Sequence, residues 1–386
     1  APMMGQELAF PEIEYEQRLH AVQKELSQQN LAAGILFDPE NIYWLTGFQT
    51  IGYFTFQCLL VLKDSKPILL SRQVNSFLAA VTPTLSQFVG IEDHKSPIRA
   101  LIDLINHHYD PSDVLGLETK AWYLTVHDYL ELKSTCGLEL SEWNGYIDEF
   151  RKIKDPSQIN RMRSAARSAE AGLAAALDAV KIGATENDLA AAMHSASIAA
   201  GSEYLGHPPL VVSGERTALC FSMWKRRELR EGDVILLESA GCVDRYHAMV
   251  ARCAVLGEPT EKQRKMADTV IAVLEKAIES IKPGVTSAEV DMKCREITES
   301  SGVEGEFAHR TGYAIGIGFP PNWSEGKFLS LRADDPTVLE PGMTFHCVPT
   351  LFGEQFGMCF SESVLVTDSG CEVLTEFPRK LFEIDI

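Results

Sequence analysis

The feature of this 386-residue chain that most constrains its fold is an internal repeat in the second half. Residues 181–189 (KIGATENDL) resemble residues 282–290 (KPGVTSAEV), and each copy follows a long stretch with helical spacing. Each copy holds a glycine suited to end a helix. A threonine follows with an acid three residues later, the capping-box signature of a new helix. The repeat therefore predicts pairs of helices with the same connection.

Each copy of the repeat is also followed by a buried strand that opens with glycine. The segments are Gly232–Leu237 and Gly342–Cys347. The second half of the chain thus predicts an α+β domain built from two related helix–helix–strand halves around a pseudo-twofold axis. Such a duplication places a site between the halves, where inward-facing strand residues meet.

The first part of the chain has a different pattern, in which short predicted strands alternate with helical stretches. This pattern is typical of an α/β domain. Residues 33–37 predict a strand and 38–40 a turn, while 56–62 and 68–71 predict a hairpin. Residues 151–157 read as a linker whose Asp155-Pro156 begins a helix. We therefore expect an N-terminal domain over 1–152 and a C-terminal domain over 153–386.

Composition limits the partners and the compartment. The net charge of −19 disfavours binding to nucleic acid or anionic membranes. No apolar run reaches the roughly 18 residues that span a bilayer. The nine cysteines stand singly without a CxxC pair, and residues 1–5 show no signal peptide. We expect a cytoplasmic protein with reduced thiols.

Several further motifs, in order and spacing, resemble the pita-bread family of creatinase and aminopeptidase P. They are residues 41–48 (NIYWLTGF), 151–163, 232–234 and 339–343 (LEPGM). This resemblance covers nearly the whole chain. It implies the creatinase-type N-terminal domain, a pita-bread catalytic domain and a homodimer in which a neighbouring N-terminal domain closes the site.

Metal-dependent members of that family hold two divalent ions with two Asp, one His and two Glu. By resemblance these positions fall on Glu238, Met249, Tyr313, Val348 and Glu362. A thioether, a neutral phenol and an aliphatic group are not ligands for hard cations. We therefore expect no metal and no other cofactor.

Within the family, the chain most resembles a metal-free branch that includes creatinase and bacterial ectoine hydrolase, which opens a cyclic amidine. The resemblance rests on residues 238–241, 245–247, 310–313, 320–323 and 342–346. The histidine that serves creatinase as acid and base falls on Phe221 here, which is a departure from that pattern.

The candidate catalytic residues are Glu238, Glu362 and His309. Two acids close together without metal should have divergent pKa values, so that one acts as an acid and the other as a base or nucleophile. His309 is suited to donate to a developing oxyanion or to carry a proton. The alternatives are a structural salt bridge for Glu238, for instance to Arg252, and a solvated His309.

The candidate substrate-binding residues are aromatic, basic or imidazole side chains near the same segments, and for each of them core packing or simple solvation is the alternative. They are Tyr313, Phe221, Trp224, Arg226, Tyr246, His247, His346 and Trp323. Aromatic faces suit a cationic amidinium, and the neighbouring Arg226 and Arg227 suit a carboxylate.

The leading functional hypothesis is a metal-independent hydrolase that cleaves a C–N bond of a small amidine, guanidino or cyclic compound. One alternative is an Xaa-Pro dipeptidase-like metallopeptidase, which would need ligands other than Met249, Tyr313 and Val348. A second alternative is a non-catalytic pita-bread binding protein.

Overall fold

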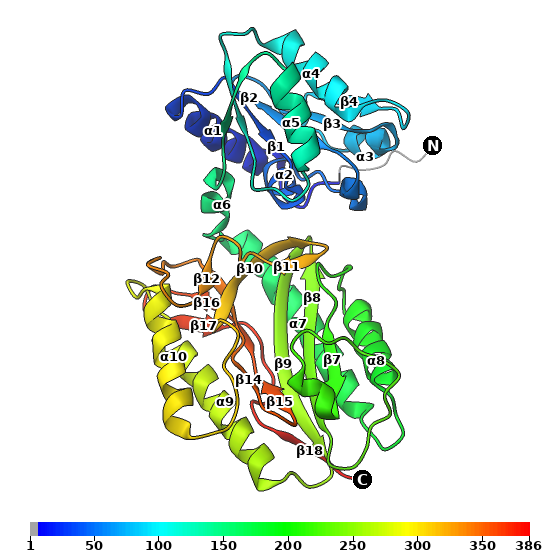
Figure 1. Ribbon diagram of the computed structural model, residues 1–386, viewed down its shortest axis with the longest axis vertical. Coiled ribbons are helices and arrows are strands. Elements are labelled where there is room, and N and C mark those ends of the chain that lie inside the picture. The colour runs from blue at the N-terminus through cyan, green and yellow to red at the C-terminus, as the bar shows by residue number, and fades with distance from the viewer. Residues whose placement is uncertain (1–6) are drawn as a thin grey trace. The chain divides into compact units, whose positions relative to one another are not determined.

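The computed structural model describes residues 7–386, so the N-terminal segment examined for a signal peptide lies outside the described residues. The chain forms two compact units, an N-terminal unit that ends at Arg151 and a C-terminal unit from Lys152 to Ile386. Figure 1 shows the elements of each unit. Within residues 7–386 no helix is long and apolar enough to cross a membrane.

The N-terminal unit is built on a six-stranded mixed sheet in the order β4-β3-β2-β1-β5-β6. The strands are β1 Ala33–Leu36, β2 Cys58–Leu62, β3 Ile68–Arg72, β4 Gln87–Ile91, β5 Val114–Leu117 and β6 Glu139–Glu142. The helices are α1 Glu12–Gln28, α2 Pro39–Thr46, α3 Ser76–Ala80, α4 Pro97–His108, α5 Val126–Thr135 and α6 Tyr146–Arg151, with short 3-10 turns η1 Ile51–Phe54 and η2 Gln73–Asn75. The predicted hairpin is the antiparallel pair β2–β3.

The segment expected as a turn at residues 38–40 instead starts helix α2, because proline fits the first helical turn. The helix is held by the buried carboxylate of Glu118, which accepts from the backbone N–H groups of Phe37 and Asp38 at 2.9 and 2.7 Å and from Asn41 Nδ2 at 2.7 Å. Arg151 in turn donates to Asn41 Oδ1 at 2.8 Å. The 41–48 motif is therefore a buried structural element of this unit.

The C-terminal unit holds a larger sheet with the strand path β17-β16-β13-β10-β9-β8-β7. Its helices are α7 Pro156–Asp178, α8 Glu186–Ala199, α9 Glu261–Ser280 and α10 Ser287–Ser301, with a 3-10 turn η3 Gly214–Ala218. Its strands are β7 Leu210–Ser213, β8 Val234–Val243, β9 Tyr246–Leu256, β10 Gly312–Phe319, β11 Asn322–Ser324, β12 Ser330–Leu331, β13 Thr344–Cys347, β14 Thr350–Phe352, β15 Gly357–Cys359, β16 Glu362–Val366, β17 Cys371–Val373 and β18 Phe382–Ile384.

The predicted duplication is confirmed element by element. Thr185 and Thr286 are the N-caps of α8 and α10, and each makes a complete capping box. Gly183 and Gly284 have positive φ angles of 82° and 87°, which glycine adopts without steric cost. Each half also closes with a bridge from its threonine, to Glu228 in one half and to Val338 in the other.

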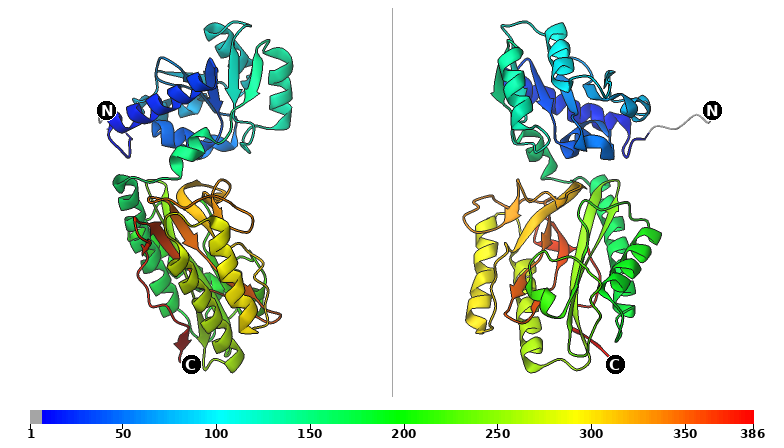
Figure 2. Two further views of the ribbon diagram at one scale, coloured as in Figure 1. Left: turned by 90° about the vertical axis from the view of Figure 1, so that its left-hand side faces the viewer. Right: turned by 45° about the vertical axis from the view of Figure 1, so that its right-hand side comes forward.

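The sheet of the C-terminal unit has two faces with different surroundings. Helices α7 and α8 pack against β8, and Figure 2 shows this layering from two further directions. Ile235 and Leu237 of β8 belong to the apolar core shared with α7. Because side chains alternate along a strand, Leu236 and Glu238 point to the opposite face, which we call the inner face. The inner face carries the candidate site.

Candidate functional site

Glu238 lies in the middle of β8, because the strand continues to Val243 instead of ending at Leu237 as the sequence suggests. Its side chain is buried, and no described residue donates a hydrogen bond to its carboxylate or pairs with it. Burial raises its pKa from 4.5 to about 7. An unpaired buried carboxyl is costly, so packing alone does not account for Glu238 on the inner face.

Four side chains next to Glu238 form a hydrogen-bonded relay. Trp323 Nε1 donates to the Tyr313 hydroxyl at 3.0 Å, and this hydroxyl lies 2.8 Å from His346 Nδ1. His346 Nε2 lies 2.6 Å from Ser361 Oγ. Burial lowers the pKa of His346 to about 3, so its imidazole is neutral near pH 7. A neutral imidazole between two hydroxyls accepts from one and donates to the other.

Sheet register explains why the relay and Glu238 share one face. Glu238 pairs with Ala251, and Ala251 bridges to Ser361. Tyr313 pairs with His346 on the neighbouring strands. Directly paired residues on antiparallel strands project their side chains to the same side. Burial raises the pKa of Tyr313, and the charge of Glu238 raises it further.

Aromatic and imidazole rings surround this relay and together form what we call the ring cluster. The ring centroids are 4.6 Å apart for His207–Trp323, 6.4 Å for His207–Phe221, 6.4 Å for Phe221–His309, 6.1 Å for His309–Tyr313 and 5.2 Å for Tyr313–His346. Burial lowers the pKa of both His207 and His309.

Sequence reasoning missed His207 and Ser361. His207 comes from the loop between α8 and β7, where only its place before Pro208-Pro209 sets it apart. Ser361 is adjacent to the residue that the family resemblance selected. Only the register of the sheet identifies it as facing the site.

The expected pairing of Glu238 with Glu362 is wrong, because the two side chains point to opposite faces of the sheet. Arg252 donates to Glu362, and Thr375 Oγ1 donates to its second oxygen at 2.8 Å. Arg252 pairs in register with Leu237, which faces the helices. Since side chains alternate along a strand, Ser361 faces the inner side and Glu362 does not. Glu362 is thus half of a buried ion pair.

Two further predicted residues serve the framework. The Tyr246 hydroxyl accepts from Gln158 Nε2 at 2.7 Å. His247 Nε2 accepts from the Gly206 backbone N–H at 2.9 Å, and its Nδ1 lies 3.0 Å from the Arg245 carbonyl. Burial lowers the pKa of His247 to about 3. His247 is therefore a core histidine that holds the backbone beside His207.

The structure does not bring Trp224 or Arg226 into the ring cluster. Trp224 lies 5.6 Å from His194 of α8 between ring centroids and packs against the core under that helix. Arg226 is exposed. The neighbouring Arg227 makes a bidentate ion pair with Asp233 at 2.6 and 3.0 Å. Arg227 is thus engaged in this ion pair instead of being free to clamp a carboxylate.

The side chains present do not fit a pair of divalent cations. Among residues 7–386, no group of three or more His, Cys, Asp or Glu side chains is arranged to hold a metal ion. Met249 and Val348 offer no oxygen or nitrogen donor. Tyr313 and His346 are already engaged in the relay. Glu362 pairs with Arg252 on the other face.

Comparisons with known proteins agree with this architecture. Residues 160–368 match metallopeptidase family M24, and residues 18–153 match the creatinase/prolidase N-terminal domain. The chain is 29% identical to the ectoine hydrolase of Halomonas elongata, with 98% of this chain and 100% of that protein covered. It is 30% identical to an uncharacterized hydrolase/peptidase of Sinorhizobium fredii, with 97% and 98% covered.

Solved structures with the same fold include a recombinant prolidase from Thermococcus sibiricus, with a TM-score of 0.86, 22% identity and 96% of this chain and 99% of that chain covered. The dipeptidase PepE from Mycobacterium ulcerans gives a TM-score of 0.83 at 19% identity, with 98% and 100% covered. At this level of identity these structures show the fold alone. Taken with the family matches and the duplicated C-terminal unit, they show that the chain is a hydrolase-family protein of pita-bread fold that belongs to family M24.

Proposed function

We propose that this protein is a metal-independent hydrolase that cleaves a C–N bond in a small amidine, guanidino or cyclic compound. The observation that carries the proposal is Glu238, a buried carboxyl with a pKa near 7 that faces rings and hydroxyls instead of metal ligands. A general base works best when its pKa lies near the working pH. Support comes from the similarity of this chain to the ectoine hydrolase of Halomonas elongata, a hydrolase of a small molecule.

The proposed reaction begins with ionised Glu238, which removes a proton from a water as the water oxygen attacks the amidine carbon. The tetrahedral species then collapses, the C–N bond breaks, and the leaving nitrogen takes the proton that Glu238 removed from the water. The relay supports this step because Tyr313 and Ser361 are hydroxyls joined by neutral His346. Hydrogen bonds aimed at developing charge are a large source of rate enhancement in a buried site.

The substrate class follows from the charge and shape of the surroundings. The described inner face offers one unpaired carboxylate, Glu238, beside the rings of Phe221, His309 and Tyr313. A flat amidinium or guanidinium cation gains from a nearby anion and from aromatic faces. A long peptide has no comparable reason to prefer such a site.

The test is turnover of ectoine, creatine and related amidines by the purified protein in the presence of a chelator. We expect product from at least one cyclic or guanidino substrate, and loss of that product in Glu238→Gln. Glu354→Gln, which changes an exposed glutamate in the loop between β14 and β15, is the matched control. Full turnover by Glu238→Gln would remove the proposal.

A second candidate is an Xaa-Pro metallopeptidase, because the Xaa-Pro dipeptidase of Pyrococcus furiosus is 24% identical over 95% of this chain. The donor set argues against it. Xaa-Pro dipeptide cleavage that appears only with added Mn²⁺ or Co²⁺ would favour it. A third outcome is a binding protein, recognised by thermal stabilisation with a substrate and no product.

We also propose a homodimer in the cytoplasm, with a small-molecule substrate and neither nucleic acid nor a membrane as partner. Large apolar side chains of the N-terminal unit are exposed, among them Phe54, Phe77 and Trp122 at 75%, 72% and 80%. Exposed apolar side chains of this size would favour a protein partner if they form one contiguous patch. The nine cysteines are all free thiols. Light scattering measures the mass in solution, and a monomer at micromolar concentration would contradict the dimer.

A further inference from the structure

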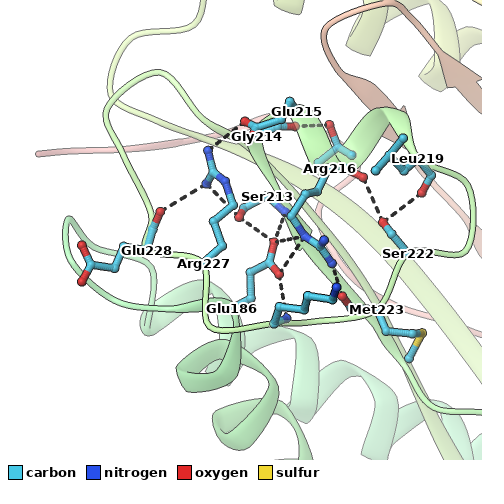
Figure 3. Close-up of polar contacts among 12 residues, drawn as sticks. Glu186, Ser213, Gly214, Glu215, Arg216, Leu219, Ser222, Met223, Arg227 and Glu228 are labelled. Atoms are coloured by element: carbon cyan, nitrogen blue, oxygen red, sulfur yellow. Dashed lines mark hydrogen bonds and ion pairs between the residues drawn. The ribbon is translucent and has the colours of Figure 1, made fainter.

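Glu186, the first residue of α8, is a fully buried carboxylate at a junction of several segments (Figure 3). It accepts from the backbone N–H and the hydroxyl of Ser213, each at 2.8 Å. It also accepts from the Lys225 backbone N–H at 2.8 Å and from Arg216 Nε at 3.2 Å. One carboxylate thus joins the start of α8, the end of β7 and the loop that follows η3.

Arg216 extends this contact into residues 219–225, which we call the site loop. Its guanidinium donates to the carbonyl of Met223, and its own carbonyl accepts from Ser222 Oγ at 3.0 Å. Phe221 lies at the tip of this loop with a φ of 61°, a left-handed conformation that is unfavourable for phenylalanine. The residue is 63% exposed, but its ring lies 6.4 Å from that of His309 in the ring cluster, measured between centroids. The loop is therefore tied to Arg216 through the two residues that directly follow the strained Phe221.

A chemically similar arrangement holds His309, the partner of Phe221 in that ring contact. Asp291 of α10 accepts from the backbone N–H of Thr311 at 3.1 Å and from its hydroxyl at 2.7 Å. Asp291 also accepts from Arg295 Nε at 2.8 Å, and Arg295 Nη2 donates to the His309 carbonyl at 3.2 Å. In each half, then, a buried acid accepts hydrogen bonds from a hydroxyl residue and from an arginine. The arginine in turn donates to a backbone carbonyl at or near the residue whose ring faces the site.

The two arrangements are not inherited copies at one position of the duplication. Glu186 is the first residue of α8, whereas Asp291 lies beyond the first turn of α10. Arg216 follows β7, whereas Arg295 lies on α10 itself. Similar chemistry at different positions, in both cases directed at the Phe221–His309 contact, points to a shared task at the site.

We propose that Glu186 and Asp291 are positioning residues that, through Arg216 and Arg295, fix Phe221 and His309 opposite each other and so set which substrates reach Glu238. The idea deepens the proposed function and rests on it for the identity of the substrate. The physical reason is that a guanidinium that donates both to a buried acid and to a backbone carbonyl leaves the backbone few alternatives. A loop held in this way fixes the distance between the rings of Phe221 and His309. That distance limits the size of the molecule that the site admits.

The first test needs no substrate. Hydrogen exchange of residues 219–225 is measured in the full-length wild-type protein and in Glu186→Gln, Arg216→Lys and Asp188→Asn. Asp188 is the matched control, because it is an exposed acid in the same first turn that only caps α8. We expect faster exchange in the first two variants and wild-type exchange in Asp188→Asn. Wild-type exchange in Arg216→Lys would overturn the proposal even if Glu186→Gln fails to fold.

The second test measures kcat and KM separately on the substrate found above. For Glu186→Gln and Arg216→Lys we expect KM to rise roughly tenfold with kcat within about twofold. Combining Arg216→Lys with Phe221→Ala should add little, since both act on one ring. An unchanged KM in a variant with a loosened site loop would also overturn the proposal. Full turnover by Glu238→Gln removes only the proposed function, because the exchange result stands without it.

Discussion

Glu238 and Glu362 belong to the same sheet but project from opposite faces of it. Glu238 faces the relay, while Glu362 accepts from Arg252 and from Thr375 on the side of the helices. Glu362 therefore cannot share a proton with Glu238. In the proposed chemistry Glu238 is the proton acceptor, and the hydrogen-bond donors come from other residue types. This relationship leads to the predictions below.

Glu238→Gln should abolish most activity, by about 10² to 10⁴-fold, the usual contribution of a general base. In the wild type, kcat/KM should fall tenfold per pH unit below the pKa of about 7 and level off above it, because only ionised Glu238 accepts a proton. The measurement is a pH–rate profile from pH 5 to 9. A flat profile through pH 7 would contradict a role for Glu238 as base.

Glu238→Gln should also stabilise the fold at alkaline pH. The folded pKa of about 7 exceeds the ordinary value of 4.5, so burial of the ionised form costs stability as pH rises from 4.5 to 7. The cost amounts to about 3 kcal/mol above pH 7 and vanishes below pH 4.5. Urea unfolding at pH 8 and pH 4.5 measures the difference. Equal gains at both pH values would show that the effect is not electrostatic.

Arg252→Met should strongly destabilise the C-terminal unit, by about 3–5 kcal/mol, because it removes the hydrogen-bonded cation of the buried Glu362 and leaves only Arg379, at 3.9 Å. Arg264→Met provides the matched control. It breaks the Arg264–Glu383 ion pair, which lies on the surface and should be worth at most about 1 kcal/mol. Denaturant unfolding gives both values. A loss for Arg252→Met no larger than that of the control would argue against a structural role for the pair.

Tyr313→Phe should lower kcat by roughly a hundredfold, within the range for loss of one oriented donor. The change removes the hydroxyl that joins Trp323 to His346 and leaves the Trp323 indole N–H unpaired. We expect a stability cost of about 1–3 kcal/mol in addition. Steady-state kinetics at fixed folded fraction separates the two effects, with Tyr129→Phe in the N-terminal unit as control. Unchanged kcat would remove the relay from the mechanism.

Phe221→Gly and Phe221→Ala should differ in stability but have the same substrate affinity. Both remove the ring, so both should raise KM. Only glycine relieves the left-handed backbone at φ 61°, which should make Phe221→Gly more stable than Phe221→Ala by about 1 kcal/mol. Thermal unfolding and KM measured side by side check this. Equal stability of the two variants would mean that the conformation carries no strain.

Added Mn²⁺, Co²⁺ or Zn²⁺ should not increase activity, and a chelator should not reduce it. Met249 and Val348 cannot ligate a hard cation, and residues 7–386 hold no group of three or more His, Cys, Asp or Glu side chains arranged for a metal ion. Elemental analysis after incubation and dialysis should find less than one ion per chain. Two tightly bound ions per chain with restored Xaa-Pro cleavage would overturn this prediction and the proposed function together.

The sequence by itself determined the architecture and the poor donor set. Local signals fixed Thr185 and Thr286 as matching helix starts, because capping depends on neighbours only three residues away. The identities of Met249 and Val348 were enough to argue against a di-metal centre, since a side chain without a donor atom cannot acquire one by folding.

Only the tertiary structure decided which polar side chains meet. A strand reverses its facing residues at every step, so Glu362 and Ser361 differ by one position and end on opposite sides of the sheet. His207 also meets Trp323 only through the tertiary structure, because the loop that carries it is distant in sequence. Composition and spacing report which groups are present, whereas strand register and long-range pairing determine which of them share a face.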